Sequence, residues 1–379
     1  MSESLRLGKL LGIDVRIHIS WFIILILLTW SLATSWFPRA FTGWMPFTYW
    51  ITAFASTLLL FVCILVHEMA HALVARIHNI VVKGITLFVF GGVTTIDQES
   101  KRPGIEFQMA IAGPLASFLL VGVAWLLSLP LRGSDTPAEA VLDYLTITNL
   151  LLGAFNLLPG FPLDGGYVLH SIIWKVTGST QRATRIASAV GQGCGYLFIL
   201  LGIGAFFAGS VFDGLWIAFI GWFLLNASQA AQKDAITRMT LHGVTVEQVM
   251  QKYPITAPAN ISLQKVVDTY MVPHGLQSIP VTQGDYLCGM ITLSDIGHIE
   301  RERWAAVPVG HTMQFAEQMY VVTPEQPLLE VLQEITIRGL NDVPVTHLGN
   351  LIGLVSHKSI MRYLSAQQDL QQERQPTIV

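Results

Sequence analysis

The hydrophobic residues of this chain are gathered into six long runs that polar segments separate. Each run is roughly 20 residues long and almost uncharged, the length that an α-helix needs to cross the hydrocarbon core of a bilayer. The runs cover residues 17–37, 50–75, 107–131, 141–158, 186–208 and 212–231. We therefore predict six transmembrane helices.

Two shorter stretches follow a different pattern. Residues 1–16 carry several charges, and we interpret them as a polar lead-in to the first helix. Residues 81–96 are rich in β-forming apolar residues around Gly91 and Gly92, which predicts a hairpin. This hairpin is either an ordinary connection or a re-entrant element whose open edge could pair with an unwound peptide strand.

The basic residues predict how the six helices are oriented. With the N-terminus inside, twelve lie in inside segments, and Arg39 and Arg132 lie in outside loops. The inside residues are Arg6, Lys9, Arg16, Arg76, Lys83, Lys101, Arg102, Lys175, Arg182, Arg185, Lys233 and Arg238. Because Lys and Arg are enriched in cytoplasmic loops, we expect both termini in the cytoplasm and the protein in the cell (inner) membrane.

The composition divides the chain near residue 232. The 379 residues are 52% hydrophobic and only 12% charged, about half the charge of a typical soluble domain. Charged residues are scarce before the division and ordinary after it, which predicts a membrane half followed by a soluble module. The net charge is −3 without a basic block, so we expect no nucleic-acid partner, and the three distant cysteines predict no disulfide framework.

The second apolar run contains the sequence His67-Glu68-Met69-Ala70-His71. On a helix, two histidines four positions apart project from one face, so both imidazoles can reach one zinc ion. Glu68 has the usual place of the general base that acts on zinc-bound water. The motif therefore indicates zinc-dependent hydrolysis inside a segment that excludes water.

A catalytic zinc usually has three protein ligands and a water, so the motif leaves one ligand to be found. The best candidate is Asp164, which follows a break in the fourth run at Pro159 and Pro162 and precedes two glycines. A carboxylate at membrane depth is functional by default. The alternative is that Asp164 caps a short helix and Asn156 satisfies carbonyls that the break sets free.

Together these segments resemble the site-2 protease family of intramembrane zinc metalloproteases. The resemblance covers the membrane half and is carried by His67-Glu68-x-x-His71, Phe90-Gly91-Gly92, Ala112-Gly113-Pro114 and Asn156-x-x-Pro159-x-x-Pro162-x-Asp164-Gly165. It implies that His67, His71 and Asp164 bind Zn²⁺. It also implies that Glu68 activates water and that Asn156 helps to hold the substrate or its oxyanion. The substrates would be membrane-anchored proteins, cut near the cytoplasmic side.

The soluble half contains an internal repeat with an offset of 64 residues (344 − 280 = 64 and 353 − 289 = 64). Ile279-Pro280-Val281 recurs as Val343-Pro344-Val345, and Gly289-Met290-Ile291-Thr292 recurs as Gly353-Leu354-Val355-Ser356. The repeat resembles a tandem pair of CBS (cystathionine-β-synthase) domains. Such pairs commonly bind adenine nucleotides and regulate an attached enzyme or transporter.

By this resemblance, Thr292 and Asp295 contact the phosphate and ribose of a nucleotide. In the second repeat Ser356 is followed by Ser359 where the family has aspartate, so this second site departs from the pattern. A serine cannot accept both ribose hydroxyls as a carboxylate can. The competing interpretation is a pair that serves only to form a homodimer.

We therefore expect an α-helical polytopic membrane protein with a C-terminal α/β CBS pair. The expected domains are 1–235 for the protease, 245–303 and 308–366 for the two CBS domains, and a disordered tail at 367–379. The predicted function is that of an intramembrane zinc endopeptidase. The alternatives are a CBS-gated metal transporter and an inactive membrane scaffold. A transporter should show several polar spans or an inverted repeat, and the sequence shows neither.

Overall fold

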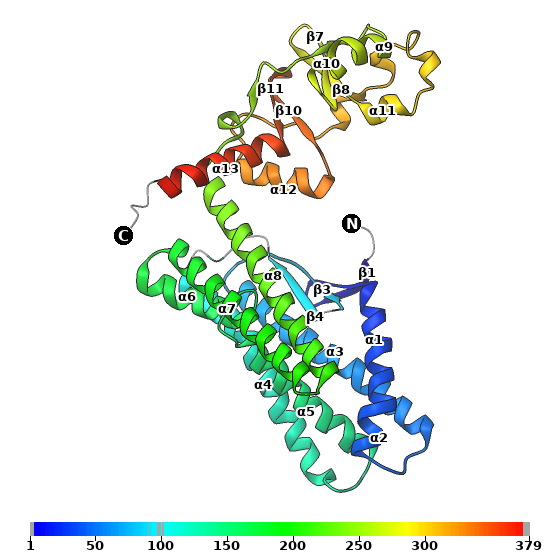
Figure 1. Ribbon diagram of the computed structural model, residues 1–379, viewed down its shortest axis with the longest axis vertical. Helices are drawn as coiled ribbons and strands as arrows, with labels where there is room; N and C mark the ends of the chain where they lie inside the picture. The colour runs from blue at the N-terminus through cyan, green and yellow to red at the C-terminus, as the bar shows by residue number, and fades with distance from the viewer. Residues whose placement is uncertain (1–3, 90, 97–99, 101, 374–379) are drawn as a thin grey trace. The chain divides into compact units, whose positions relative to one another are not determined.

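The computed structural model describes residues 4–89, 91–96, 100 and 102–373. Two positions used above, Phe90 in the predicted hairpin and Lys101 among the inside cations, lie outside the described residues. The chain divides into two compact units, Met1–Lys233 and Asp234–Val379. Figure 1 shows the elements of both units, coloured from blue at the N-terminus to red at the C-terminus.

Unit 1 confirms the six predicted membrane spans. The described residues contain six helical segments that are long and apolar enough to cross a membrane: Ser20–Ala40, Pro46–Ile77, Pro103–Leu131, Pro137–Asn156, Thr180–Phe207 and Val211–Leu241. Their elements are α1 (Ser20–Ser31), a π-helical turn (Leu32–Trp36), α2 (Phe37–Ala40), α3 (Pro46–Ile77), α4 (Pro103–Ser128), a 3-10 turn (Leu129–Leu131), α5 (Pro137–Asn156), α7 (Thr180–Phe207) and α8 (Val211–Leu241). A shorter helix, α6 (Asp164–Thr177), lies between α5 and α7.

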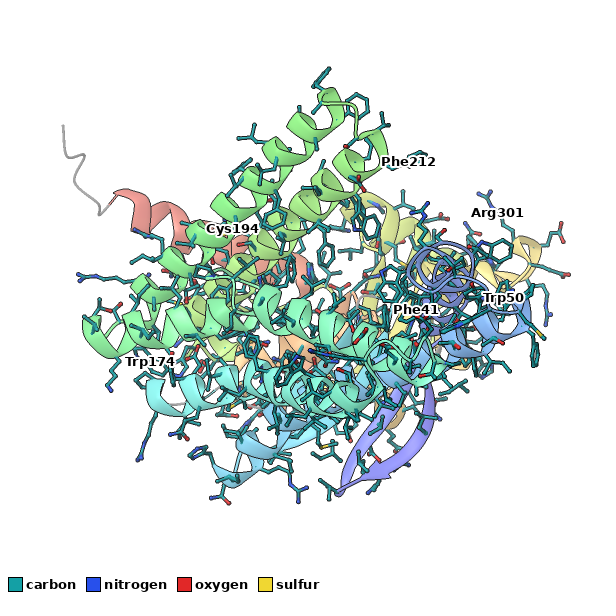
Figure 2. All side chains as sticks on the ribbon, turned by 90° about the horizontal axis from the view of Figure 1, so that it is seen from below. Phe41, Trp50, Trp174, Cys194, Phe212 and Arg301 are labelled. Atoms are coloured by element: carbon teal, nitrogen blue, oxygen red, sulfur yellow. The ribbon has the colours of Figure 1, made fainter. Side chains whose placement is uncertain are left out.

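Apolar side chains on the outside of these helices agree with a lipid environment. Trp50 on α3, which packs edge-to-face against Trp30 of α1, is 41% exposed, and Phe212 on α8 is 87% exposed (both labelled in Figure 2). Small residues instead face neighbouring helices, as is usual where membrane helices pack closely. At Gly202 of α7, an added Cβ would lie only 2.4 Å from the backbone nitrogen of Ala218 in α8.

Four strands form a sheet in the order β1-β2-β3-β4. They are β1 (Ser4–Leu10), β2 (Ile13–His18), β3 (Val82–Phe88) and β4 (Gly91–Ile96). The β3–β4 pair confirms the predicted hairpin, and β3 also pairs in parallel with β2. The interpretation of residues 1–16 as a polar lead-in was wrong, because β1 and β2 form an N-terminal hairpin. Ile13, Val15 and Ile17 alternate with polar residues and bury one face of β2. The charged residues of this segment favoured the interpretation as a polar lead-in.

The sheet packs along the part of α3 that carries the zinc motif. Ile13 of β2 and Ile85 of β3 share a buried cluster with Met69, a residue inside the motif. Further along, Ile17 packs in a cluster with Phe61 of α3. The contact therefore follows α3 over more than two turns and brings the β3–β4 hairpin beside the motif.

The predicted break after the fourth span is confirmed. Helix α5 ends at Asn156, an irregular segment follows, and α6 begins at Asp164. The segment packs against α7 at Gly160, where an added Cβ would lie 2.3 Å from the Cα atom of Gly191. Because both contacting residues are glycines, the two backbones can approach closely and fix the start of α6.

Unit 2 has one sheet in which the two repeats exchange short strands. The strand order is β10-β11-β8-β7-β6, with β5 of the first repeat on β11 and β9 of the second repeat on β8. The strands are β5 (Gln251–Lys252), β6 (Ala257–Pro258), β7 (Ser278–Gln283), β8 (Tyr286–Thr292), β9 (Gln314–Phe315), β10 (Asp342–His347) and β11 (Asn350–Ser356). The helices are α9 (Leu263–Val266), α10 (Val272–His274), α11 (Leu293–Gly297), α12 (Leu328–Arg338) and α13 (His357–Glu373). Short helical turns cover Val246–Gln248, Val267–Met271, Arg301–Arg303, Val309–His311 and Ala316–Gln318.

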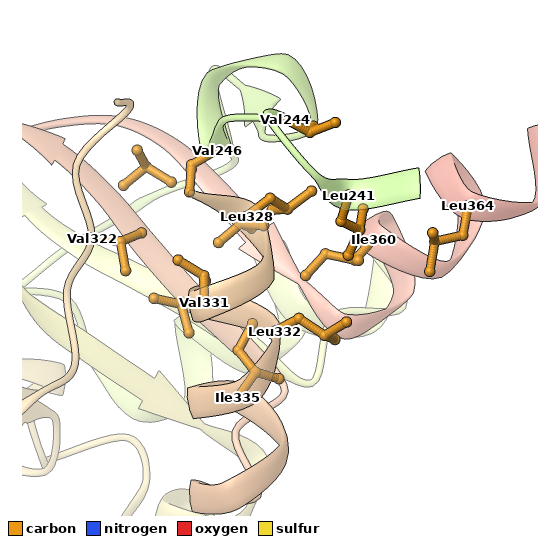
Figure 3. Close-up of a cluster of buried hydrophobic side chains, with 13 residues drawn as sticks. Leu241, Val244, Val246, Val322, Leu328, Val331, Leu332, Ile335, Ile360 and Leu364 are labelled. Carbon is orange, nitrogen blue, oxygen red and sulfur yellow. The ribbon is translucent and has the colours of Figure 1, made fainter. Parts of the chain in front are cut away.

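Unit 2 has two hydrophobic cores, one centred on each repeat, and each core includes side chains from the other repeat: Val246 lies in the second core, and Val309 and Met313 lie in the first. In the second repeat, α12 directs Leu328, Val331, Leu332 and Ile335 into a cluster that Figure 3 shows in close-up. This i, i+3, i+4, i+7 spacing is that of an amphipathic helix. The tail that was predicted to be disordered, 367–379, is helical in its first part, because α13 continues to Glu373. The remaining residues, 374–379, lie outside the described residues.

Candidate active site

Three side chains from two helices converge inside unit 1. The Nε2 atoms of His67 and His71 lie 3.2 Å apart. The Oδ2 atom of Asp164 lies 3.1 Å from the first and 3.3 Å from the second. Within the described residues, this is the one group of three His, Cys, Asp or Glu side chains whose ligand atoms are close enough to share a metal ion. The helical spacing of the motif and the break before α6 thus bring together the residues that the sequence suggested.

The outer nitrogen of each imidazole has a hydrogen-bonding partner on α4. Nδ1 of His71 donates to the carbonyl of Met109 at 2.7 Å, and Nδ1 of His67 is hydrogen-bonded to Ser117 Oγ at 2.9 Å. Such partners fix the ring orientation and leave the other nitrogen free to bind a metal. Ser117 and the Met109 carbonyl were missed by sequence reasoning, because a contact between distant helices leaves no local signal.

The arrangement fits a zinc ion in two respects. First, with Zn–N distances of 2.0–2.1 Å, the edge of a tetrahedron of ligands is about 3.3 Å long, close to the three observed separations. Second, the hydrogen bond from Nδ1 of His71 to the Met109 carbonyl leaves Nε2, which faces the carboxylate of Asp164, as the nitrogen available to coordinate a metal.

Glu68 lies beside this cluster and is held by the β3–β4 hairpin. Thr94 Oγ1 of β4 donates to Glu68 Oε2 at 2.7 Å. Gly92, on the same strand, is so close that an added Cβ would lie 2.5 Å from Glu68 Cγ. Only a glycine lets the strand approach the carboxylate this closely. The Gly91-Gly92 pair was recognised in the sequence as part of a hairpin, whereas Thr94 was not.

Gly113 gives α4 its close approach to the two imidazoles. An added Cβ would lie 2.1 Å from His71 Nε2 and 2.6 Å from His67 Nε2. The next residue, Pro114, lies inside α4 and has no backbone N–H to donate to the helix. The Ala112-Gly113-Pro114 motif therefore has a direct steric role at the site.

Asn156 is not brought into this cluster by a hydrogen bond. It is the last residue of α5, and its side-chain amide donates to the carbonyl of Leu152 in the same helix at 3.0 Å. The contact lies within α5 and not with a carbonyl that the break sets free.

His170, for which the sequence predicts no role, joins three helices close to the site. It lies on α6 six residues after Asp164, and its Nδ1 is 2.7 Å from Glu106 Oε1 on α4. Its Nε2 lies 3.1 Å from Thr184 Oγ1 on α7. The ring also packs against Phe161, in the segment that leads to α6. His170 therefore fixes α6, and with it Asp164, against the helices on both sides.

The predicted nucleotide-binding residues lie at two helix starts in unit 2. Thr292 and Asp295 form a reciprocal capping box at α11, in which the Asp295 carboxylate accepts from the backbone and hydroxyl of Thr292. Ser356 and Ser359 exchange the equivalent backbone bonds at α13. The two motifs thus occupy matching positions in the two repeats, and both act as helix caps.

A cavity of about 220 Å³ in the second repeat is formed by other residues. Its lining consists of Gln314, Gln318, Met319, Tyr320, Arg338, Leu340 and Asp342. The guanidinium of Arg338 lies 4.9 Å from the ring centre of Tyr320. Burial, together with the carboxylate of Glu334, raises the pKa of the Tyr320 phenol, which therefore stays a neutral hydrogen-bond donor. None of the residues predicted to bind nucleotide lines this cavity.

Comparison with known families matches both halves of the chain. Peptidase family M50 matches residues 55–136 and 132–201, which include the histidine motif and Asp164. The CBS domain matches twice, at residues 246–298 and 315–366. The two CBS matches agree with the sequence repeat.

Relatives match over nearly the whole length. A protein of Synechocystis sp. whose name assigns it provisionally to the zinc metalloproteases is 34% identical over 96% of both chains. Rip3 of Mycobacterium tuberculosis, named in the same way, is 33% identical over 96% of this chain and 93% of its own. The solved site-2 protease of Methanocaldococcus jannaschii is 26% identical, with a TM-score of 0.42 over 60% of this chain and 95% of its own. The chain therefore belongs to peptidase family M50, the site-2 protease family of multi-pass membrane zinc metalloproteases, and carries a C-terminal pair of CBS domains.

Proposed function

We propose that this protein is an intramembrane endopeptidase that cuts membrane-anchored proteins near the cytoplasmic side of the cell (inner) membrane, with His67, His71 and Asp164 as the zinc ligands. The observation that carries the proposal is the convergence of these three ligand atoms, at zinc-like spacing, beside the carboxylate of Glu68. Membrane helices surround the cluster, so the peptide to be cut must come from a membrane-anchored protein.

The side chains around the cluster have separate roles in hydrolysis. A zinc ion held by His67, His71 and Asp164 would supply Lewis acidity, which lowers the pKa of a bound water and polarises a peptide carbonyl. The Glu68 carboxylate takes the proton from the attacking water and passes it to the leaving amine. Thr94 holds one oxygen of that carboxylate and leaves the other free to accept the proton. Asn156 helps to bind the substrate or its oxyanion once a peptide is present.

The substrate must be extended before it can be cut, because a helix hides its carbonyls in internal hydrogen bonds. The outer strand of the sheet, β4, has an edge without a strand neighbour among the described residues. An extended peptide that pairs with this edge would lie next to Thr94 and Glu68. Because His71 is six residues from the end of α3, the site lies about 9 Å along the axis from that helix end. Water therefore has a short route to the site.

The test compares wild type with Glu68→Gln in proteoliposomes that contain a membrane-anchored peptide. The variant keeps the size of the side chain but removes the base, so we expect it to bind zinc as wild type does and to lose cleavage. Equal cleavage by both proteins would defeat the mechanism. Bound metal is measured in parallel by elemental analysis, with His67→Ala as a metal-deficient control.

The alternatives make different predictions in the same vesicles. A CBS-gated metal transporter would carry Zn²⁺ into the lumen, which an enclosed zinc indicator reports. An inactive scaffold would neither transport metal nor cut any membrane-anchored peptide in a panel. Cleavage that depends on Glu68, without zinc entry, supports the protease and excludes both alternatives.

We also propose that the CBS pair binds an adenine nucleotide through Thr292, Asp295 and Ser356, and that the nucleotide alters substrate access. The chemistry is compatible at Asp295, whose carboxylate accepts a hydrogen bond from the Thr292 hydroxyl. With a nucleotide bound, the carboxylate would instead accept hydrogen bonds from the two ribose hydroxyls. Calorimetric titration of ATP, ADP and AMP into the full-length protein tests binding, with Asp295→Ala as the variant. If no nucleotide binds and none changes the cleavage rate, the pair has another role, such as dimerisation.

A further inference from the structure

The N-terminal hairpin has an apolar face that the protein covers only in part. In its antiparallel register, Leu5 lies opposite Ile17 and Leu10 opposite Ile13, and residues paired in this way project from the same face. Ile13 and Ile17 are buried against α3, whereas Leu5 and Leu10 are 61% and 46% exposed. The buried face of β2 therefore continues as an uncovered apolar face on β1.

The opposite face of the same hairpin is basic. Arg6 lies opposite Arg16, and Lys9 lies opposite Asp14. Arg6 forms an ion pair with Asp14, and with Lys9 and Arg16 the described residues of this face carry a net charge of +2 (3 − 1 = 2). Like charges directly opposite each other destabilise a strand pair. An anion bound at this face would remove that repulsion.

The hairpin is attached to membrane helices at both of its ends. Strand β2 ends at His18, and α1, the first membrane span, begins at Ser20. At the turn, the carbonyl of Leu11 accepts a hydrogen bond from Arg76, which lies in the last turn of α3. Since α1 begins and α3 ends at the same membrane surface, the hairpin lies at that surface.

We propose that the β1–β2 hairpin is an interfacial lipid-binding element. Leu5 and Leu10 enter the acyl region beside α1, and Arg6, Lys9 and Arg16 bind the phosphate groups of anionic phospholipids. The separation of an apolar and a basic face matches the chemistry of the lipid–water boundary. The occupant is the bilayer, because the hairpin continues directly into a membrane span. This inference does not depend on zinc binding or on proteolysis.

The depth of each face can be measured in the full-length protein. Cys63, Cys194 and Cys288 are replaced by alanine, and a single nitroxide label is placed at Leu5→Cys or, as the matched control on the opposite face, at Ser4→Cys. In vesicles we expect the label at position 5 to collide several-fold more often with dissolved oxygen than with a water-soluble nickel complex. The label at position 4 should show the reverse preference.

The lipid headgroup is tested with a charge variant, Lys9→Gln/Arg16→Gln. Each cation near an anionic surface contributes on the order of 1 kcal/mol, so the preference for phosphatidylglycerol over phosphatidylcholine should fall about 30-fold. The preference is read from lipids retained by the purified protein in native mass spectrometry. Lys358→Gln/Arg362→Gln, on exposed positions of α13, removes the same charge from unit 2 and should leave the preference unchanged.

Three results would overturn the proposal. A label at position 5 that is as accessible to nickel as the one at position 4 would place the apolar face in water. Spin–spin broadening between labels on two copies would assign that face to a dimer. An unchanged lipid preference in Lys9→Gln/Arg16→Gln would show that the basic face does not bind headgroups.

Discussion

At the scale of single residues, the candidate active site depends on groups that are not metal ligands. Two glycines allow close approach, with Gly113 under the imidazoles and Gly92 under Glu68. Ser117 and the carbonyl of Met109 orient the histidines, and Thr94 orients the base. Substitutions at such positions should damage the site without removing a ligand.

Gly113→Ala is expected to displace both imidazoles, because the new methyl group would overlap their Nε2 atoms. We expect zinc affinity to fall at least tenfold, as measured by competition with a chelator, and cleavage to fall with it. Gly122→Ala, about two and a half turns further along the same helix, is the control, since an added Cβ there meets nothing within 4 Å. Equal zinc affinity in the two variants would contradict the steric role of Gly113.

Thr94→Val should lower the cleavage rate without loss of zinc. The substitution removes a hydrogen bond to a carboxylate, and such bonds contribute about 1.5–3 kcal/mol, so kcat/KM should fall about 10-fold to 100-fold. Thr95→Val is the matched control, because Thr95 is exposed on the same strand. If Thr95→Val lowers kcat/KM as much as Thr94→Val does, the effect belongs to the strand and not to the contact with Glu68.

At the scale of secondary-structure elements, the position of Asp164 depends on how α6 is held. His170 joins α6 to Glu106 on α4 and to Thr184 on α7, and its side chain is only 10% exposed. Removing one partner of a buried hydrogen-bonded pair is costly, because the other polar group stays buried without compensation. The pair is thus a structural support for a metal ligand six residues away.

A double-mutant cycle measures this support. Glu106→Ala and His170→Ala should each lower stability, and the double variant should be less harmful than the sum, with a coupling of about 1–3 kcal/mol. Thermal unfolding gives the stability, and the electronic spectrum of bound Co²⁺ reports the ligand geometry. An unaltered cobalt spectrum in His170→Ala would show that the pair supports α6 but does not position Asp164.

The elements differ in how far they could be predicted from the sequence. The six spans were predictable because each is one long apolar run, and the break before Asp164 is marked by Pro159 and Pro162. The N-terminal hairpin was not, because the apolar alternation Ile13, Val15, Ile17 is short and its partner strand β3 lies far along the chain. The contacts of Ser117, Met109 and His170 arise from helix packing, which a single sequence does not encode locally.

At the scale of the whole molecule, the distribution of cations predicts the topology. Twelve basic residues in the inside segments, against Arg39 and Arg132 outside, support a cytoplasmic location for both termini. The soluble unit and the end of α3 nearest the zinc cluster would then lie on the same side of the membrane. A nucleotide signal from the cytoplasm would therefore not have to cross the bilayer.

The topology can be tested with single cysteines in a cysteine-free chain. Ser134→Cys lies in a loop that we predict to be outside and Gln283→Cys in the soluble unit, and both positions are exposed. In intact cells, a maleimide that passes the outer envelope but does not cross the inner membrane should label the Ser134→Cys variant. It should label the Gln283→Cys variant only after the membrane is opened. Labelling in the opposite order would invert the predicted topology.

The exchange of short strands in unit 2 has a consequence for how that unit unfolds. Strand β5 of the first repeat completes the sheet at β11, and β9 of the second repeat completes it at β8. If one repeat unfolds, it exposes backbone N–H and C=O groups of the other repeat that were hydrogen-bonded to it. We therefore expect the two repeats to melt in one cooperative transition. A deletion of either repeat should leave an open sheet edge prone to aggregation, and not a smaller stable domain.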